Sequence, residues 1–254
     1  MKRIDVNVLL GHWPFRKLYK EGLSNMKAYF KEEGVELGLV SSVNSTFYND
    51  AFEGDEELYE EIGNDKAFKS VMTINPKVPG WREDLENGIK KFNICAVKVF
   101  PGIHGYRLED AIFWELVNVL EEKQIPIMVA QRLEDERNTY LYVPTPLDTE
   151  ALKVFGKKAK TPVIFLHLLT WEVGGLGEIF DGNHDCYFDT SGLRGATFPI
   201  EEMLRTVKID TIMFGTQYPM LSEKASTYIV DRAEISAEDK EKILYKNAER
   251  VFGL

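Results

Sequence analysis

Short apolar runs alternate with longer segments of helical periodicity along the whole chain, about every 30 residues. The runs are rich in Val, Ile, Leu and Phe without strict polar alternation, which is typical of strands buried on both faces of a parallel sheet. The pattern predicts eight strands: Arg3–Leu9, Glu36–Ser42, Phe68–Ile74, Ala96–Phe100, Ile125–Gln131, Val163–Leu168, Cys186–Thr190 and Thr211–Phe214.

The segments between these strands have the spacing of amphipathic helices. In the segment Asp110–Glu122, Ile112, Leu116 and Leu120 recur at helical intervals, and Asp110 stands where it can cap the N-terminus. The expected helices are Asn25–Glu33, Asp55–Ile62, Arg82–Phe92, Asp110–Glu122, Thr149–Lys158, Val173–Phe180, Ile200–Thr206, Glu223–Arg232 and Ala237–Val251.

Alternating strands and helices require parallel pairing with right-handed crossovers, in either an open doubly wound sheet or a closed barrel. No Gly-rich phosphate loop follows the first strand, which argues against a dinucleotide-binding sheet. The 254 residues match the size of one (β/α)8 barrel, and no linker divides them. We therefore expect an α/β protein with one domain, residues 1–254, forming a TIM barrel with an extra C-terminal helix.

Composition narrows the function classes. The 41 acidic and 31 basic residues give a net charge of −10, which argues against binding to nucleic acid or to an anionic membrane surface. No apolar run approaches the roughly 20 residues that span a bilayer, and no cleavable leader is visible. Cys95 and Cys186 form no paired motif. A cytoplasmic protein is expected, and the sequence allows a homo-oligomer.

In a TIM barrel the site lies at the C-terminal ends of the strands. Lys98 falls inside the fourth strand between Val97 and Val99, and burying its charge is costly unless it is paired or bound to a ligand. His104 lies four residues after the end of that strand. A structurally paired lysine and an exposed loop histidine are the alternatives for these two positions.

Basic residues gather at the predicted mouth of this acidic chain, and the loop 131–137 after the fifth strand is highly charged. Arginine forks match carboxylates, so a small anionic ligand is expected, although such a loop can also be a solvated face. The basic residues are Arg16, Lys98, Arg132, Arg137 and Arg194. Aromatic residues such as Trp13 could wall the pocket or could fill the core between barrel and helices.

Three segments resemble the amidohydrolase superfamily, in its amidohydrolase-related branch of metal-dependent TIM-barrel hydrolases and decarboxylases. Ile4-Asp5-Val6-Asn7-Val8-Leu9 resembles the first strand of that family, and Met213-Phe214-Gly215-Thr216-Gln217-Tyr218-Pro219 resembles the last. The tail 243–254 resembles the C-terminal helix of the family. The resemblance covers the whole chain length and implies the same barrel.

The family holds one or two divalent metals with a His-x-His pair on strand one, His residues ending strands five and six, and an Asp ending strand eight. The corresponding residues here are Asn7, Leu9, Gln131, His167 and Gln217. Leu9 offers no donor, and Gln217 has neither the charge nor the basicity of an aspartate. We therefore expect a divergent member with a degenerate site and no metal, a single divalent metal at His167 being the alternative.

The resemblance implies a hydrolase or a decarboxylase-like lyase acting on a small carboxylate-bearing molecule. His167 or His104 would serve as acid and base with Asp135 as partner, although His167 could also be a hydrogen-bonded core residue. The predicted substrate-binding residues are Lys98 and Arg132 as an anion clamp, with Gln131, Gln217, Asn7, Arg16 and Trp13. A catalytically silent barrel that binds a small molecule or a partner subunit is the alternative, because one barrel fold hosts many functions.

Overall fold

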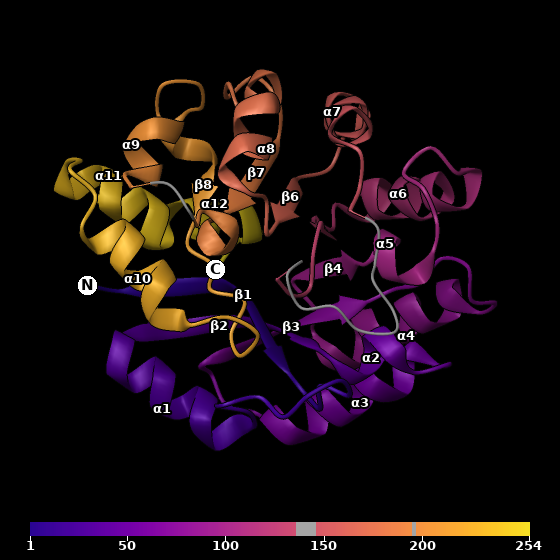
Figure 1. The fold of residues 1–254 in the computed structure, drawn as a ribbon. Coiled ribbons are helices and arrows are strands. Elements are labelled where there is room, and N and C mark those ends of the chain that lie inside the picture. The colour runs from indigo at the N-terminus through magenta and orange to yellow at the C-terminus, as the bar shows by residue number, and fades with distance from the viewer. Residues whose placement is uncertain (136–145, 195–196) are drawn as a thin grey trace.

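The computed structural model describes residues 1–135, 146–194 and 197–254. In these ranges eight parallel strands follow one another in chain order around a single sheet (Figure 1). They are β1 (Arg3–Leu10), β2 (Val35–Ser42), β3 (Phe68–Thr73), β4 (Ala96–Val99), β5 (Ile127–Ala130), β6 (Val163–Leu166), β7 (Cys186–Asp189) and β8 (Ile212–Met213). All eight predicted strands are confirmed.

The segment around β8 returns to β1 and nearly closes the sheet. The backbone N–H of Val6 donates to the carbonyl of Phe214 at 3.0 Å, and that of Leu9 donates to Tyr218 at 2.8 Å. In the opposite direction, the N–H of Gln217 donates to the carbonyl of Asn7 at 2.8 Å. These bonds join the last segment to the first, so the predicted (β/α)8 barrel is confirmed.

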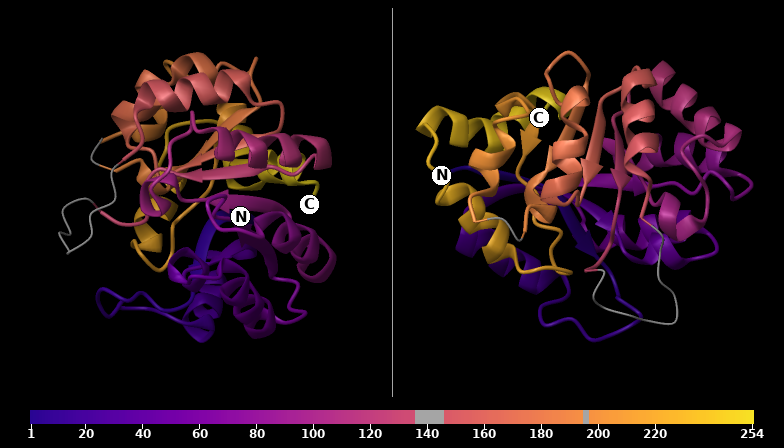
Figure 2. Two further views of the ribbon diagram at one scale, coloured as in Figure 1. Left: turned by 90° about the vertical axis from the view of Figure 1, so that its right-hand side faces the viewer. Right: turned by 45° about the horizontal axis from the view of Figure 1, so that its top comes forward.

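Helices surround the barrel on its outer side (Figure 2). The α-helices of the described residues are α1 (Leu23–Glu33), α2 (Asn44–Phe47), α3 (Ala51–Ile62), α4 (Trp81–Phe92), α5 (Pro101–His104), α6 (Ala111–Lys123), α7 (Thr149–Lys158), α8 (Thr170–Gly175), α9 (Pro199–Met203), α10 (Glu223–Asp231), α11 (Ala237–Glu241) and α12 (Asn247–Phe252). Three 3₁₀ turns and one π-helical turn accompany them: η1 (Gly177–Ile179), η2 (Thr190–Gly192), η3 (Ile209–Thr211) and η4 (Lys242–Lys246).

Two expectations about the helices need correction. The segment predicted as one helix, Val173–Phe180, divides into α8 and η1. Asp110 precedes α6 but makes no capping bond; its carboxylate accepts the backbone N–H of Arg107 at 2.8 Å instead. The carboxylate of Asp110 therefore stabilises the turn before the helix instead of the first turn of the helix. None of the helices in the described ranges combines the length and apolar character needed to cross a membrane.

Alternation along each strand decides which residues enter the barrel. On β4, Val97 and Val99 face outward into the core between barrel and helices, whereas Ala96 and Lys98 face the interior. On β1 the register with β2 shifts between Asp5 and Val8. This bulge lets two successive residues face inward: Val6 joins the apolar interior and Asn7 reaches the mouth.

The interior of the barrel is apolar at its N-terminal end and polar at its mouth. Ile4, Val71, Met128 and Ile164 belong to the apolar layer, which Ala248 of α12 helps to close. The expected C-terminal helix is therefore present, and it covers the bottom of the barrel. Polar side chains are concentrated at the opposite end, where the site must be sought.

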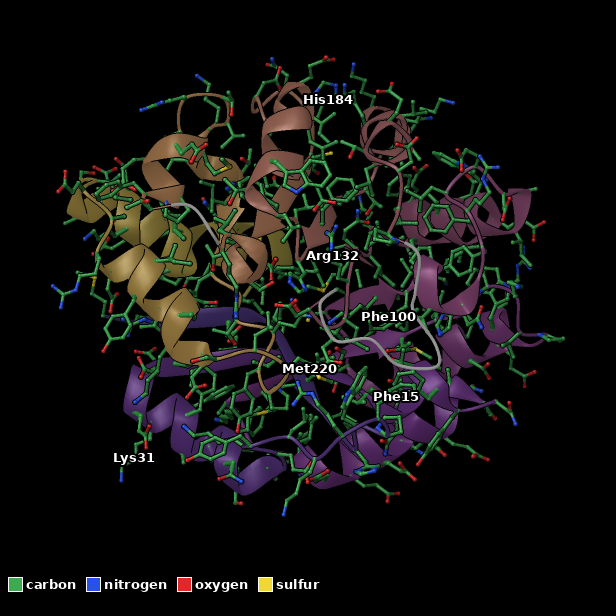
Figure 3. All side chains as sticks on the ribbon, in the orientation of Figure 1. Phe15, Lys31, Phe100, Arg132, His184 and Met220 are labelled. Carbon is green, nitrogen blue, oxygen red and sulfur yellow. The ribbon has the colours of Figure 1, made fainter. Side chains whose placement is uncertain are left out.

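A separate apolar cluster lies at the mouth itself, made of Leu9, Trp13, Leu18, Val43, Phe100, Ala130, Leu133 and Met220. Figure 3 shows Phe100, Arg132 and Met220 around the middle of the molecule, and Lys31 and His184 at its edge. Trp13, predicted to bind substrate, is buried in this cluster with its ring edge-on to Phe15 and Phe47. The mouth thus combines polar groups with an apolar wall.

Candidate active site

Lys98 is at the centre of the mouth, at the C-terminal end of β4. Its side chain is only 3% exposed, and its Nζ donates to Asn7 Oδ1 at 2.9 Å and to Ser41 Oγ at 3.1 Å. Both acceptors are neutral, and no ion pair joins Lys98 to a carboxylate within the described ranges. Burial lowers the pKa of Lys98 to about 7, although Asp189 and Asp5 act in the opposite direction.

Asp189, at the end of β7, is the second charge of this centre. Its Oδ2 accepts from Asn7 Nδ2 at 2.8 Å, and its Oδ1 accepts the backbone N–H of His167 at 2.8 Å. Burial raises the pKa of Asp189, while these hydrogen bonds oppose the rise. Asn7 therefore bridges the two residues: its amide oxygen accepts from Lys98, and its amide nitrogen donates to Asp189.

Asp5 supports this centre from the outer side of β1. Its carboxylate accepts from the hydroxyl of Tyr29 at 2.7 Å and from the Thr216 hydroxyl at 2.6 Å. It also accepts the backbone N–H groups of Asn7 and Thr216 at 3.0 and 3.1 Å. Burial raises the pKa of Asp5 to about 6. Because it binds the backbone at Asn7 and at Thr216, Asp5 fixes the position of Asn7 and the segment leading to Gln217.

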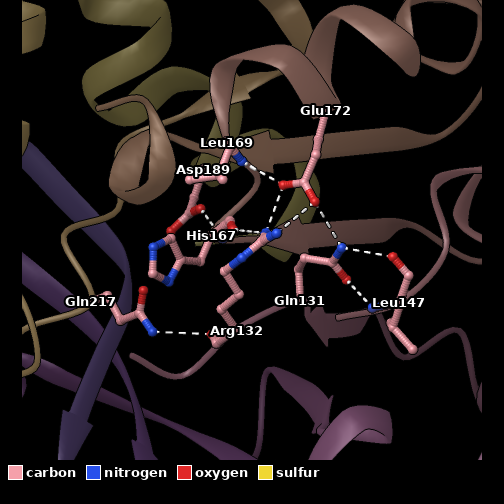
Figure 4. A network of polar contacts seen from close by, with 8 residues as sticks. All are labelled: Gln131, Arg132, Leu147, His167, Leu169, Glu172, Asp189 and Gln217. Carbon is pink, nitrogen blue, oxygen red and sulfur yellow. Dashed lines mark hydrogen bonds and ion pairs between the residues drawn. The ribbon is translucent and has the colours of Figure 1, made fainter. Parts of the chain in front are cut away.

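His167 and Gln217 follow β6 and β8, each with a backbone φ of 56°. Such a value is uncommon for residues with a Cβ and is a recurrent feature of functional sites. Gln217 Nε2 donates to the carbonyls of Arg132 at 3.1 Å and Leu133 at 2.8 Å, but its Oε1 has no hydrogen-bond partner. The Nδ1 of His167 is also buried without a partner. Figure 4 shows both side chains beside Arg132.

The imidazole of His167 is neutral at ordinary pH. Burial is the main cause, and the positive charges of Arg132 and Arg194 add to it; together they lower the pKa of His167 to about 3. Asp135 acts in the opposite direction, so this predicted partner carboxylate lies within electrostatic range of His167. The structure therefore brings His167, Asp135 and Arg194 into one neighbourhood.

Arg132 belongs to a second network at the rim of the mouth (Figure 4). Its Nη1 and Nη2 donate to Glu172 Oε2 and Oε1 at 2.6 and 2.8 Å. Glu172 also accepts the N–H of Leu169 at 2.7 Å and Gln131 Nε2 at 2.9 Å. Gln131 in turn exchanges hydrogen bonds with the backbone of Leu147. Arg132 and Gln131 therefore connect the segments after β5 and β6, and the role of Arg132 in holding an anion stays a prediction.

Two other predicted residues lie away from Lys98. His104 is on α5, where its Nε2 lies 3.1 Å from the carbonyl oxygen of Thr46 and its ring contacts Phe100 and Tyr106. Burial lowers the pKa of His104. Arg16 is exposed and forms an ion pair with Glu134 at 2.5 Å. Arg137 lies outside the described residues.

Arg194, which follows η2, has a guanidinium nitrogen without a hydrogen-bond partner. Its Nε donates to the carbonyl of Ser191 at 3.1 Å, while its buried Nη2 has no hydrogen-bond partner. Burial lowers the pKa of Arg194, and Asp135 and Asp189 oppose this. Its guanidinium therefore faces the same charges as His167 and Lys98.

The family's metal positions do not fit a divalent ion in this chain. Leu9 has no donor atom, Asn7 Oδ1 is taken by Lys98, and both amide atoms of Gln131 are engaged. Only His167 Nδ1 and Gln217 Oε1 remain, short of the three protein ligands that catalytic zinc uses. No group of three or more His, Cys, Asp or Glu side chains comes together within the described ranges. Whenever it is protonated, Lys98 would also repel a cation here.

The fold and the polar mouth together define a TIM-barrel protein with its chemistry at the strand ends. The chain belongs to the amidohydrolase family, whose sequence model matches residues 49–254. No curated protein sequence matches the chain.

Solved structures extend the likeness of fold over the whole chain. A 2,6-dihydroxybenzoate decarboxylase from Rhizobium has a TM-score of 0.72 at 14% identity, covering 99% of this chain and 98% of that one. A 5-carboxyvanillate decarboxylase from Sphingomonas paucimobilis has a TM-score of 0.73 at 12% identity, with coverages of 92% and 84%. A dihydroxybenzoic acid decarboxylase from Polaromonas sp. JS666, with bound manganese and 2-nitroresorcinol, has a TM-score of 0.71 at 15% identity, with coverages of 100% and 97%.

Sequence reasoning missed four residues that organise the site: Asp5, Ser41, Glu172 and Asp189. Asp189 and Ser41 end their strands and face the barrel, so the strand-end rule that selected Lys98 could have found them. Glu172 lies within α8, and nothing local in the sequence indicates its pairing with Arg132.

Proposed function

We propose that the chain is an enzyme, a hydrolase or lyase that acts on a small carboxylate-bearing molecule at the barrel mouth without the binuclear metal centre of its family. One observation carries the proposal: a buried lysine, held by neutral acceptors, donates a hydrogen bond to Asn7, the residue at one of the family's metal-ligand positions. A positive charge at this place can stabilise negative charge that develops during a reaction, as a metal does.

The surrounding residues support an anionic substrate. Arg194 offers a buried Nη2 without a partner, which can donate to a carboxylate. Lys98 offers a second positive centre whenever it is protonated. Because Arg132 is held by Glu172, we assign the clamp first to Lys98 and Arg194, with Arg132 fixing the loop behind them.

His167 and Gln217 supply the directed polar atoms. The neutral imidazole of His167 can accept a hydrogen bond or a proton at its free nitrogen, and Asp135 would stabilise the imidazolium that forms. The unpartnered Oε1 of Gln217 can orient a substrate hydroxyl or a water molecule. Cytoplasmic location and a homo-oligomer stay predictions.

Turnover by metal-free protein tests the proposal. The protein is treated with a chelator, checked by elemental analysis, and offered a panel of oxo acids, aromatic acids, lactones and esters. Conversion that persists without metal, and that falls more than about tenfold in Arg194→Gln, supports the proposal. Conversion only after zinc or manganese is restored contradicts it. Tight binding of an acid without conversion would identify a binding barrel instead.

A further inference from the structure

Lys98 is the one lysine that is buried in the described part of the chain. The other lysines with a shifted pKa, such as Lys2 and Lys20, have it raised by a carboxylate that pairs with them. Lys98 has no such partner. Its two neutral acceptors can bind the uncharged amine as well as the ammonium, because the amine still has protons to donate. The site therefore tolerates the uncharged, nucleophilic form.

Apolar side chains lie close to the Nζ of Lys98. The Phe100 ring centroid is 5.4 Å from Nζ, and Phe100 belongs to the apolar mouth cluster with Leu9 and Met220. Leu9 occupies the second position of the family's His-x-His pair, where it presents methyl groups instead of a ligand atom. An apolar wall beside a buried amine is the environment in which lysines act as nucleophiles.

We propose that Lys98 forms an imine with a 3-oxo carboxylate, and that this imine accepts the electron pair released when the carboxylate leaves as carbon dioxide. The proposal rests on the proposed function and narrows it to a lyase that cleaves a carbon–carbon bond. In this proposal the amine of Lys98 takes the place of the metal ligands that the chain lacks.

The steps balance without any further reactant. The Nζ lone pair attacks the carbonyl carbon, the carbonyl oxygen takes a proton, and loss of water leaves a protonated imine. The bond to the carboxylate carbon breaks, its electrons move into the imine to give an enamine, and carbon dioxide departs. A proton then adds to the enamine carbon, and the water released earlier, or another, hydrolyses the imine and frees Lys98. The net change is one 3-oxo acid and one proton converted to a ketone and carbon dioxide.

The neighbouring residues have defined parts in this sequence. Asn7 and Ser41 aim the Nζ, because each holds one of its donated hydrogen bonds. His167 and Asn7 both bind Asp189, and the unpartnered nitrogen of His167 can form a hydrogen bond with the adduct. A pKa of about 7 leaves a substantial fraction of Lys98 uncharged at neutral pH, which nucleophilic attack requires.

Reductive trapping tests the proposal. Wild-type protein is incubated near neutral pH with acetoacetate and cyanoborohydride, digested, and mapped by mass spectrometry. We expect an adduct on Lys98, carrying an isopropyl group where carbon dioxide was lost before reduction, in excess over the exposed Lys31 by more than about tenfold. An unmodified Lys98 beside modified surface lysines would overturn the proposal.

Two variants sharpen the result. Lys98→Arg keeps a positive charge but cannot form an imine, so it should lose the trapped adduct and the decarboxylation of acetoacetate. Lys31→Arg removes an exposed amine and should keep both. Trapping in the wild type stands by itself if Lys98→Arg fails to fold. Pyruvate serves as a second probe. It can form the imine, but its carboxylate is attached directly to the imine carbon, so the imine cannot accept the electron pair that loss of carbon dioxide would release.

The two proposals fail in different ways. An adduct on Lys98 without conversion of any acid supports the imine and contradicts the enzymatic function. Metal-free conversion of an acid that continues in Lys98→Arg supports the function and overturns the imine.

Discussion

Arg132 and Lys98 are both buried cations at the mouth of the barrel, yet the fold gives them opposite surroundings. Arg132 has a carboxylate of its own, Glu172, bound through two nitrogens, and Glu172 has further donors in Leu169 and Gln131. Lys98 has an amide oxygen and a hydroxyl, both neutral. The first cation is paired with a carboxylate, and the second is bound by neutral acceptors.

The two residues were predicted together as an anion clamp, but their surroundings in the fold differ. A buried ion pair with every lone pair satisfied holds segments in place, and breaking it leaves an uncompensated charge. A buried amine without an anion has its pKa lowered, which is how lysine becomes a base or a nucleophile. The pairing around a buried charge, more than its burial, therefore distinguishes the rim network from the central site.

Removing the carboxylate at the rim should have the largest effect on stability. Glu172→Gln removes the buried carboxylate that Arg132 binds through two nitrogens, so we expect the free energy of unfolding to fall by about 3–5 kcal/mol. Denaturant unfolding at neutral pH measures this. The matched control is Glu115→Gln, whose partner Arg82 and own side chain are both more than half exposed, and it should change little. A loss equal in the two variants would contradict the comparison.

Replacing the central amine should change how stability depends on pH. The folded pKa of Lys98 is about 7, while the unfolded chain keeps the ordinary value of 10.5. Between these values the unfolded chain binds more protons, so the wild type should gain stability as the pH rises, by up to about 1.4 kcal/mol per pH unit. Lys98→Met should lose this slope and be relatively most stable near neutral pH. Parallel profiles for the two proteins would show that Lys98 is charged in the fold.

Gln217→Asp probes whether a metal site can be restored. The variant loses the amide donor to the carbonyls of Arg132 and Leu133, and burial disfavours the new charge, so we expect a loss of about 1–3 kcal/mol in stability. One carboxylate and His167 remain short of three ligands, so no metal-stimulated hydrolysis should appear. Hydrolysis of a lactone stimulated by zinc in this variant alone would show that the ligand positions are misassigned.

The smallest effect is expected at the exposed edge of the mouth. Arg16 pairs with Glu134, and although the Glu134 side chain is only 8% exposed, that of Arg16 is 37% exposed, so water partly screens the pair. Arg16→Gln should change the free energy of unfolding by less than about 1 kcal/mol. Its conversion of acids should match that of the wild type if Arg16 has no part in binding, whereas a raised KM would confirm the predicted substrate contact.

The sequence alone determined the barrel. The eight strands could be predicted because alternation and apolar runs are local patterns, and the parallel order follows from the helices between them. The place of Lys98 within a strand marked it as a candidate, whereas His167 and Gln217 were selected through the resemblance to the family's metal-ligand positions.

Only the tertiary structure decided what these residues can do. Glu172 is 40 residues from Arg132 in the chain, and Asn7 is 91 residues from Lys98, so no local pattern could show either contact. The bulge on β1 that turns Asn7 inward depends on pairing with β2. A pKa is set by desolvation and by charges brought close in space, and both exist only once the strands have closed the barrel.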